Sequence, residues 1–133
     1  MFRHFIAIKT FEHQMDCFCS DGTHAEVLTI HKEDIIEIIN ERKFMIEKGW
    51  YFLIRMNNQY NFHIALEDLE RYYLNERLLS LIDIELALNY LQFKVDQALD
   101  TGDEELFLNF TKKLKESRDL KMKLEQCVHN VAV

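Results

Sequence analysis

Two cysteines and two histidines near the amino terminus are the residues whose types and spacing come closest to a chemical site. Cys17 and Cys19 are two residues apart, His13 precedes them, and His24 follows a turn-forming segment at residues 20–23. On an extended strand, residues two apart share a face, so two thiols and a histidine of the partner strand can approach the ligand set of zinc. Structural zinc sites use a tight pair of ligands on each side of a knuckle, and only one such pair stands here. We expect half-buried cysteines, with a metal- or thiol-dependent site as the alternative.

Elsewhere the sequence shows no recognisable catalytic set. The three glycines, at positions 22, 49 and 102, are each isolated in a predicted turn, which excludes a glycine-rich phosphate loop. Adjacent acids such as Glu67 and Asp68 fall on predicted helices, where acids are solvated or favour the first turn. The sequence therefore predicts a protein that is not an enzyme and needs no cofactor.

The composition is that of a globular protein. Of the 133 residues, 48% are hydrophobic and 29% are charged, which is too apolar for a disordered chain. The net charge of -7 opposes binding to nucleic acid and to anionic membranes. The densest basic group alternates with acids, as on a solvated helix face; it consists of Lys112, Lys113, Lys115, Arg118, Lys121 and Lys123. We expect neither a nucleic-acid nor a membrane partner.

Location follows from similar arguments. Charges interrupt every apolar run before it reaches the roughly 18 to 20 residues that cross a bilayer. The amino-terminal residues lack the apolar core and cleavage site of a signal peptide. Three cysteines, an odd number, suit a reducing compartment. These features predict a cytoplasmic protein.

The first half of the chain has the pattern of a small antiparallel sheet. Apolar and polar residues alternate in short runs, as they do when one face of a sheet covers a core. The candidate strands are residues 2–9, 16–19, 24–30, 43–47, 50–57 and 60–64. The pair Asp21-Gly22 is the strongest hairpin signal because both residues tolerate positive φ. Residues 34–42 have four isoleucines at helical spacing and are predicted as a short helix, with a strand as the open alternative.

After residue 65 the apolar spacing lengthens to that of helices. Helices are predicted at residues 66–73, at about 76–99 and after Gly102, which can take the left-handed conformation that ends a helix. Thr101 and Glu104 have the spacing of a capping box for the last helix. So short a connection makes the two long helices antiparallel neighbours. The predicted fold is α+β, with a β-rich lobe at residues 1–65 and a helical lobe at residues 66–133, which can share one core.

The second of these helices is apolar on more than one side. One stripe consists of Leu81, Ile84, Leu88, Leu91, Val95 and Ala98, whereas Ile82, Leu86 and Phe93 point elsewhere. A helix of this kind is expected to be buried between neighbours.

Four aromatic residues are candidate contacts for a partner: Tyr72, Tyr73, Tyr90 and Phe93. Adjacent residues of a helix cannot both face one core, and Tyr90 lies off the main stripe of its helix, so at least one tyrosine should be exposed. Exposed tyrosines often anchor protein contacts; packing with the hydroxyl at the surface is the open alternative. The leading hypothesis is a regulatory or adaptor-like protein that binds a protein partner, or a second copy as a homodimer, through its helical hairpin. A small-ligand pocket on the sheet is a further hypothesis.

Residues 91–116, LQFKVDQALDTGDEELFLNFTKKLKE, resemble the IDEAL domain, a short helical module of proteins from low-GC Gram-positive bacteria. The pentapeptide that names the family stands here as Val95-Asp96-Gln97-Ala98-Leu99, with two letters changed. The downstream pattern is matched by Asp100, Asp103, Glu104, Glu105, Phe107, Thr111 and Leu114. The family has no established catalysis, so the resemblance implies a helical interaction module. The same residues also suit folding, because a small Ala98 lets the two helices approach and Phe107 fills the space beside it.

Overall fold

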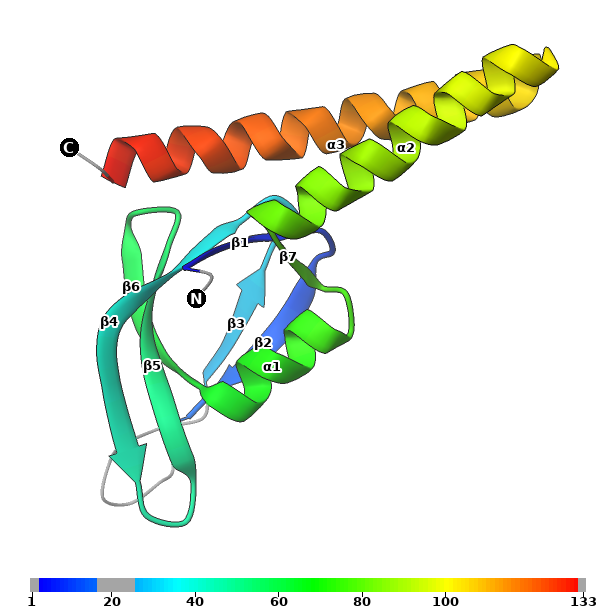
Figure 1. Cartoon of the computed structure of the whole chain (residues 1–133). Helices are drawn as coiled ribbons and strands as arrows, with labels where there is room; N and C mark the ends of the chain where they lie inside the picture. The colour runs from blue at the N-terminus through cyan, green and yellow to red at the C-terminus, as the bar shows by residue number, and fades with distance from the viewer. Residues whose placement is uncertain (1–2, 17–25, 132–133) are drawn as a thin grey trace. The chain divides into compact units, whose positions relative to one another are not determined.

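The chain is an α+β protein (Figure 1). The computed structural model describes residues 3–16 and 26–131, with side chains described up to residue 128. It divides into two compact units, Met1–Leu79 and Ser80–Val133. The elements in chain order are β1 (His4–Ala7), β2 (Phe11–Met15), β3 (Glu26–Ile30), β4 (Ile35–Met45), β5 (Gly49–Met56), β6 (Tyr60–Ala65), α1 (Leu66–Leu74), β7 (Leu78–Ser80), α2 (Leu81–Thr101) and α3 (Glu104–Val131).

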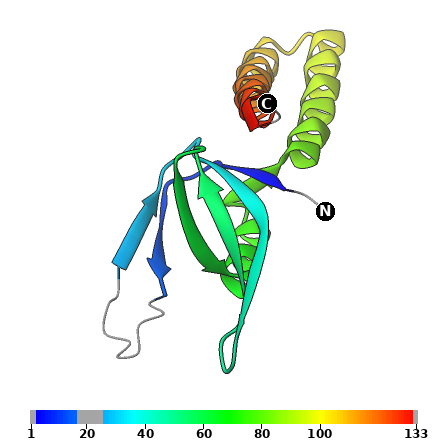
Figure 2. The same ribbon diagram turned by 90° about the vertical axis from the view of Figure 1, so that its left-hand side faces the viewer.

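The first unit contains a five-stranded sheet and a two-stranded ribbon. The sheet has the order β6-β5-β4-β1-β7, and the pairs β1–β4, β4–β5 and β5–β6 are antiparallel. The ribbon pairs β2 with β3, from Phe11 opposite Ile30 to Met15 opposite Glu26. Figure 2 shows the ribbon standing beside the meander of β4, β5 and β6. The predicted turn at Asp21-Gly22 lies outside the described residues.

The predicted meander is confirmed, and its turns follow from residue chemistry. Asn57 and Asn58 both have positive φ, 53° and 60°, which is the geometry of the tight turns that match strand twist. At the other end of β5, Gly49 has a φ of 90° and directly follows the turn at residues 46–48 that joins β4 to β5. Asparagine and glycine are the residues that adopt such angles at the lowest cost.

The short helix expected at residues 34–42 is wrong, and the alternative is correct. Residues 35–42 belong to β4, in which Ile36 pairs with Met56 and Ile38 with Ile54. Ile35, Ile36 and Ile38 are all buried, so this part of the strand is covered on both faces. A strand buried on both faces has a continuous apolar run, and such a run also contains apolar residues at helical spacing.

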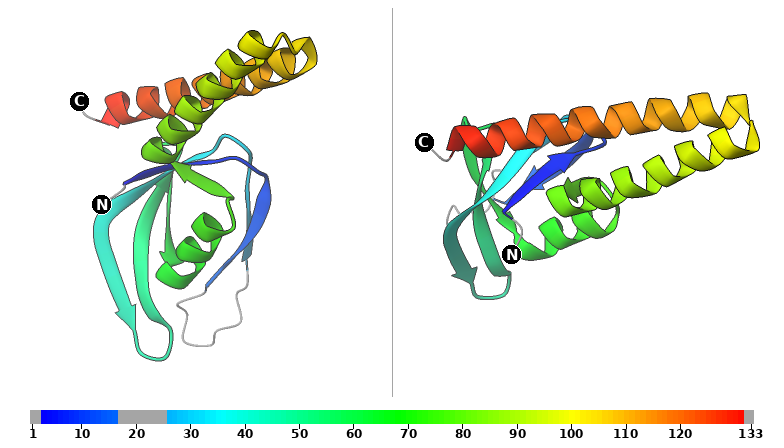
Figure 3. Two further views of the ribbon diagram at one scale, coloured as in Figure 1. Left: turned by 45° about the vertical axis from the view of Figure 1, so that its right-hand side comes forward. Right: turned by 45° about the horizontal axis from the view of Figure 1, so that its top comes forward.

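Helix α1 lies between the sheet and the ribbon (Figures 1 and 3). Its Leu69 and Tyr72 join the buried cluster of the first unit, together with residues of both β structures. Tyr73 meets the ring of Phe5 on β1 edge to face, with centroids 5.7 Å apart, whereas Tyr72 meets Phe11 on β2 at 4.7 Å. Two sides of the helix are therefore covered.

The second unit is the predicted helical hairpin. Residues 78–80, expected at the start of the second helix, form β7 instead, and Ser80 and Asp83 make a capping box at the start of α2. Gly102 ends α2 with a φ of 71°, in the left-handed region, as predicted.

The cap predicted for the last helix is wrong. Thr101 lies in α2, where its hydroxyl donates to the carbonyl oxygen of Gln97 at 3.1 Å. Asp103 caps α3, because its carboxylate accepts from the backbone N–H of Leu106 at 3.1 Å. None of the described helices has the length and apolar character needed to span a bilayer.

Candidate functional site

Helix α2 carries four large apolar side chains on one exposed face. Ile82, Leu86, Tyr90 and Phe93 follow one another at intervals of three or four residues. At about 100° per residue they fall within an arc of roughly 80°. Their exposed fractions are 49%, 62%, 57% and 61%. We call these four residues the outer stripe.

The opposite side of α2 packs against α3. Leu91 and Val95 of α2 form a buried cluster with Leu114 of α3, and Leu88, Phe107 and Phe110 pack around it. Leu88, Leu91 and Val95 belong to the main apolar stripe of α2 that the sequence pattern shows. The outer stripe points away from α3 as a result, because the two stripes lie on opposite sides of the helix.

The charges of α2 are mostly negative. Asp83, Glu85, Asp96 and Asp100 are its acids, and Lys94 is its only base. The ammonium group of Lys94 lies 5.6 Å from the ring centroid of Tyr90 and covers part of the stripe. The outer stripe is thus an apolar band with a predominantly acidic surround.

A shallow hollow lies between the two helices near their connection. Lys94, Gln97, Ala98 and Thr101 line it from α2, and Leu106 and Phe110 line it from α3. Its volume is about 380 Å³. Leu106 is 44% exposed there, so apolar surface is also present on the α3 side.

Residues 85–114 match the family model of the IDEAL domain. This segment holds most of α2, the turn at Gly102 and the first part of α3, and the resemblance predicted from the sequence is confirmed. No curated protein and no solved structure shows a significant match to the chain.

The IDEAL segment contains both the hairpin packing and most of the exposed face. Val95 and Ala98 of the family pentapeptide are 7% and 4% exposed, while Asp96 accepts a hydrogen bond from Gln92. Asp103 is the helix cap described above. The family positions therefore correspond largely to residues that fold the hairpin, whereas Tyr90 and Phe93 lie within the segment on its exposed face.

The four predicted partner contacts have different surroundings. Tyr90 and Phe93 are exposed and belong to the outer stripe. Tyr73 is partly buried and packs on the core of the first unit. Tyr72 is 3% exposed, which makes it unsuitable as a surface contact. Tyr72 and Tyr73 both contact the core because α1 is covered on two sides, and the expected exposed tyrosine is Tyr90.

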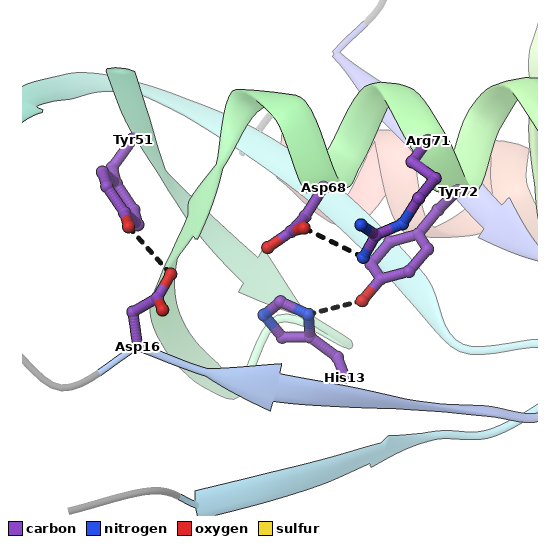
Figure 4. Close-up of polar contacts among 6 residues, drawn as sticks. All are labelled: His13, Asp16, Tyr51, Asp68, Arg71 and Tyr72. Carbon is purple, nitrogen blue, oxygen red and sulfur yellow. Dashed lines mark hydrogen bonds and ion pairs between the residues drawn. The ribbon is translucent and has the colours of Figure 1, made fainter. Parts of the chain in front are cut away.

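Outside the IDEAL segment, a polar cluster links α1 to β2 and β5 (Figure 4). Nδ1 of His13 and the hydroxyl of Tyr72 are 2.7 Å apart, and both residues are buried. Asp68 pairs with the guanidinium of Arg71 at 2.9 Å. Tyr51 donates its hydroxyl hydrogen to the carboxylate of Asp16 at 2.8 Å. The contact of His13 with Tyr72 joins the ribbon to α1, and the contact of Tyr51 with Asp16 joins the end of the ribbon to the sheet.

Burial within the cluster favours the neutral forms of His13 and Tyr51. Burial lowers the pKa of His13, although the carboxylates of Asp68 and Asp16 act in the opposite direction. Burial, followed by the hydrogen bond to Asp16, raises the pKa of Tyr51 to about 12. His13 and Tyr51 are each 2% exposed, so a substrate has no access to them. We interpret the cluster as a structural link.

The alternative metal site stays a prediction. His13 is the one member of its set within the described residues; Cys17, Cys19 and His24 lie outside them. Nδ1 of His13 is already hydrogen-bonded to Tyr72. Within the described part of the chain, no three His, Cys, Asp or Glu side chains gather in a way that would hold a metal ion.

The sequence pattern separates the outer stripe from the main apolar stripe, because Ile82, Leu86, Tyr90 and Phe93 all lie off the latter. The expectation that the helix is buried on several sides is wrong for these four residues. The fold shows which of the two apolar sides of α2 is covered by α3 within the hairpin.

Proposed function

We propose that the protein binds another protein through the outer stripe of α2. The observation that supports the proposal most directly is the alignment of four large apolar side chains, each about half exposed or more, on the side of α2 opposite α3. Contiguous apolar surface on a helix marks interaction sites, whereas isolated exposed apolar residues are ordinary.

The exposed apolar residues of α3 offer a useful contrast. Leu108 and Met122 are 59% and 57% exposed, as exposed as the residues of the outer stripe. They are fourteen residues apart, close to four helical turns, and do not form a band. Their exposure needs no partner to explain it, which makes Leu108 a suitable control position.

The physical gain from binding comes from covering the stripe. Each apolar side chain removed from water contributes roughly 25 cal/mol per Å² of buried area. Tyr90 and Phe93 add aromatic surface of the kind that dominates binding energy at protein contacts. The acids of α2 favour a partner with a basic rim over a second copy of the same acidic surface.

The test places a photoreactive amino acid at Phe93 or, as a matched control, at Leu108 in the intact chain expressed in its native cell. If the outer stripe binds a protein, irradiation should give one dominant crosslinked species from position 93 and not from position 108. Changing Leu86 and Tyr90 to Ala in the chain labelled at 93 should reduce the yield at least tenfold.

Sedimentation velocity of the purified chain at micromolar concentration tests self-association separately. A dimer that the same Leu86→Ala and Tyr90→Ala changes dissociate would identify the partner as a second copy. Equal crosslinking from positions 93 and 108, together with a monomeric chain, would rule out the proposal.

A further inference from the structure

The first unit contains a groove of its own, whereas the proposed contact surface belongs to the second unit. The groove runs between α1 and the face of the sheet that α1 covers, and its volume is about 270 Å³. Phe5, Ile38 and Phe52 line it from the sheet, and Leu66, Leu69 and Tyr73 line it from α1. Among the described residues that line it, Glu70, which is exposed on α1, is the only charged one.

A second hollow continues this groove toward the bulge of β4. Its volume is about 170 Å³, and residues 38–42, Arg3 and Phe52 line it. Ile38 and Phe52 line both hollows, so the two are contiguous. Together they reach the lower limit of roughly 300 Å³ that is typical of ligand sites.

A bulge in β4, where its pairing with β5 shifts register, determines which side chain lines the second hollow. Ile38 pairs with Ile54, and the next pair is Arg42 with Phe52, so β4 advances by four residues while β5 advances by two. A regular ladder would have placed Asn40 opposite Phe52. The two extra residues in β4 are an even number, so Arg42 lies on the same face as Ile38. The guanidinium of Arg42 therefore stands where a regular ladder would place the amide of Asn40. Bulges often re-aim side chains in this way beside functional sites.

Two guanidinium groups consequently lie at one end of an apolar groove. Arg3 is two residues from Phe5 on β1 and shares its face, and both Arg3 and Arg42 are exposed. Arg42 lies over the ring of Trp50, 5.5 Å from its centroid. Glu41, also exposed, is the one acid among the lining residues that the structure describes. The end is therefore net positive in an otherwise acidic chain.

The lining also selects against peptides. A peptide segment in the groove would bury N–H and C=O groups beside Phe5, Leu69 and Tyr73, which offer almost no polar atoms. A hydrocarbon chain has no such groups. The arginines, in turn, suit a planar carboxylate, which a guanidinium can bind through two parallel hydrogen bonds.

We propose that the groove binds a single-chain carboxylate, such as a fatty-acid anion, with the chain between α1 and the sheet and the carboxylate at Arg3 and Arg42. This inference is independent of the outer stripe, which belongs to the other unit of the chain.

The test uses the full chain and dodecanoate below its micelle concentration, with binding measured by calorimetry. One dodecanoate should bind per chain in a saturable manner, and dodecanol, which lacks the carboxylate, should bind at least tenfold more weakly. The double change Arg3→Gln and Arg42→Gln should weaken dodecanoate binding by a similar factor. Both arginines are exposed, so these changes should leave the fold intact. Arg118→Gln, at an exposed arginine of α3, is the matched control and should have no effect.

Amide chemical shifts provide the second readout. Dodecanoate should shift the amides of β1, β4, β5 and α1. Absence of saturable binding, equal binding of dodecanol, an unchanged affinity in the double variant, or shifts confined to α2 would each overturn the proposal. If the groove's amides shift with protein concentration alone, its occupant is a second copy of the chain instead.

Discussion

Helices α1 and α2 are both apolar on two sides, but their surroundings within their own units differ. Helix α1 lies between the sheet and the ribbon, so Leu69 and Tyr72 are 5% and 3% exposed. Helix α2 packs on α3 along one stripe, and its other apolar side retains Leu86 and Tyr90 at 62% and 57% exposed. An apolar second side on a helix therefore indicates an interior position only where a further element is available to cover it.

The outer stripe differs from the second apolar side of α1 because its side chains remain exposed to water. Leaving apolar side chains of this size in water forgoes stabilisation that α1 obtains from the same kinds of residue. The hairpin tolerates this because its inner stripe already holds α2 against α3. The stripe is therefore free for a contact that folding does not use.

The largest difference is expected between matched leucines. Leu69→Ala should lower the free energy of unfolding by about 2 to 5 kcal/mol, because it opens a cavity between α1 and its neighbours. Leu86→Ala should change it by no more than about 0.5 kcal/mol, because that side chain is already solvated. Urea unfolding followed by circular dichroism measures both. A similar loss in both variants would mean that the outer stripe is covered in the free protein.

The two tyrosines provide a subtler comparison. Tyr72→Phe should cost about 1 to 3 kcal/mol, because it removes the partner of Nδ1 of His13 inside the core. Tyr90→Phe should be neutral within about 0.5 kcal/mol, since water replaces its contacts. The same unfolding experiment decides the matter. A neutral Tyr72→Phe variant would show that the link between the ribbon and α1 is unimportant.

The next prediction concerns how much the cap of α3 contributes to the stability of the hairpin. Asp103→Ala should destabilise the protein by about 1 kcal/mol, since the N–H of Leu106 loses its acceptor. Thr101→Ala should cost less, because the Thr101 hydroxyl only adds bonds to carbonyl groups already inside α2. Thermal unfolding of the two variants ranks the residues, and the reverse ranking would restore Thr101 as the cap.

The smallest effect is expected from pH and should act on the first unit. Burial lowers the pKa of His13 and of His4 below that of an unfolded histidine, about 6.5. In this range the unfolded chain therefore binds more protons than the folded chain. The free energy of unfolding should fall as the pH drops from 7 through 6.5 toward 5. The effect is moderated because Asp68 and Asp16 near His13, and Glu37 near His4, raise the same pKa values.

Urea unfolding at pH 7 and pH 5.5 measures this dependence. His13→Asn should reduce the difference between the two pH values, whatever its own effect on stability. A protein that becomes more stable on acidification over this range would contradict the argument.

Local chemistry predicted much of the hairpin and the meander. Gly102 ends α2 and Asn57 turns the chain between β5 and β6 because each residue suits a positive φ by itself. The IDEAL resemblance was also visible, because the family pentapeptide at residues 95–99 and the motif that follows it can be read directly from the sequence.

Apart from the cap of α3, the errors occurred where an element depends on residues distant in sequence. Ile35, Ile36 and Ile38 lie in a strand because β1 and β5 pair with both edges of β4. Tyr72 is buried because β2, which precedes it by some sixty residues, supplies Phe11 and His13. The groove depends in the same way on Arg3, Arg42 and α1, which no local pattern connects.

The amino-acid sequence by itself determined the α+β class, the turns and the amphipathic character of each helix, because these follow from the backbone preferences of single residues and the spacing of their neighbours. The tertiary structure alone decided which apolar faces are covered and which remain in water. Coverage depends on which elements meet in space, and such contacts form between segments whose separation along the chain has no periodic signal.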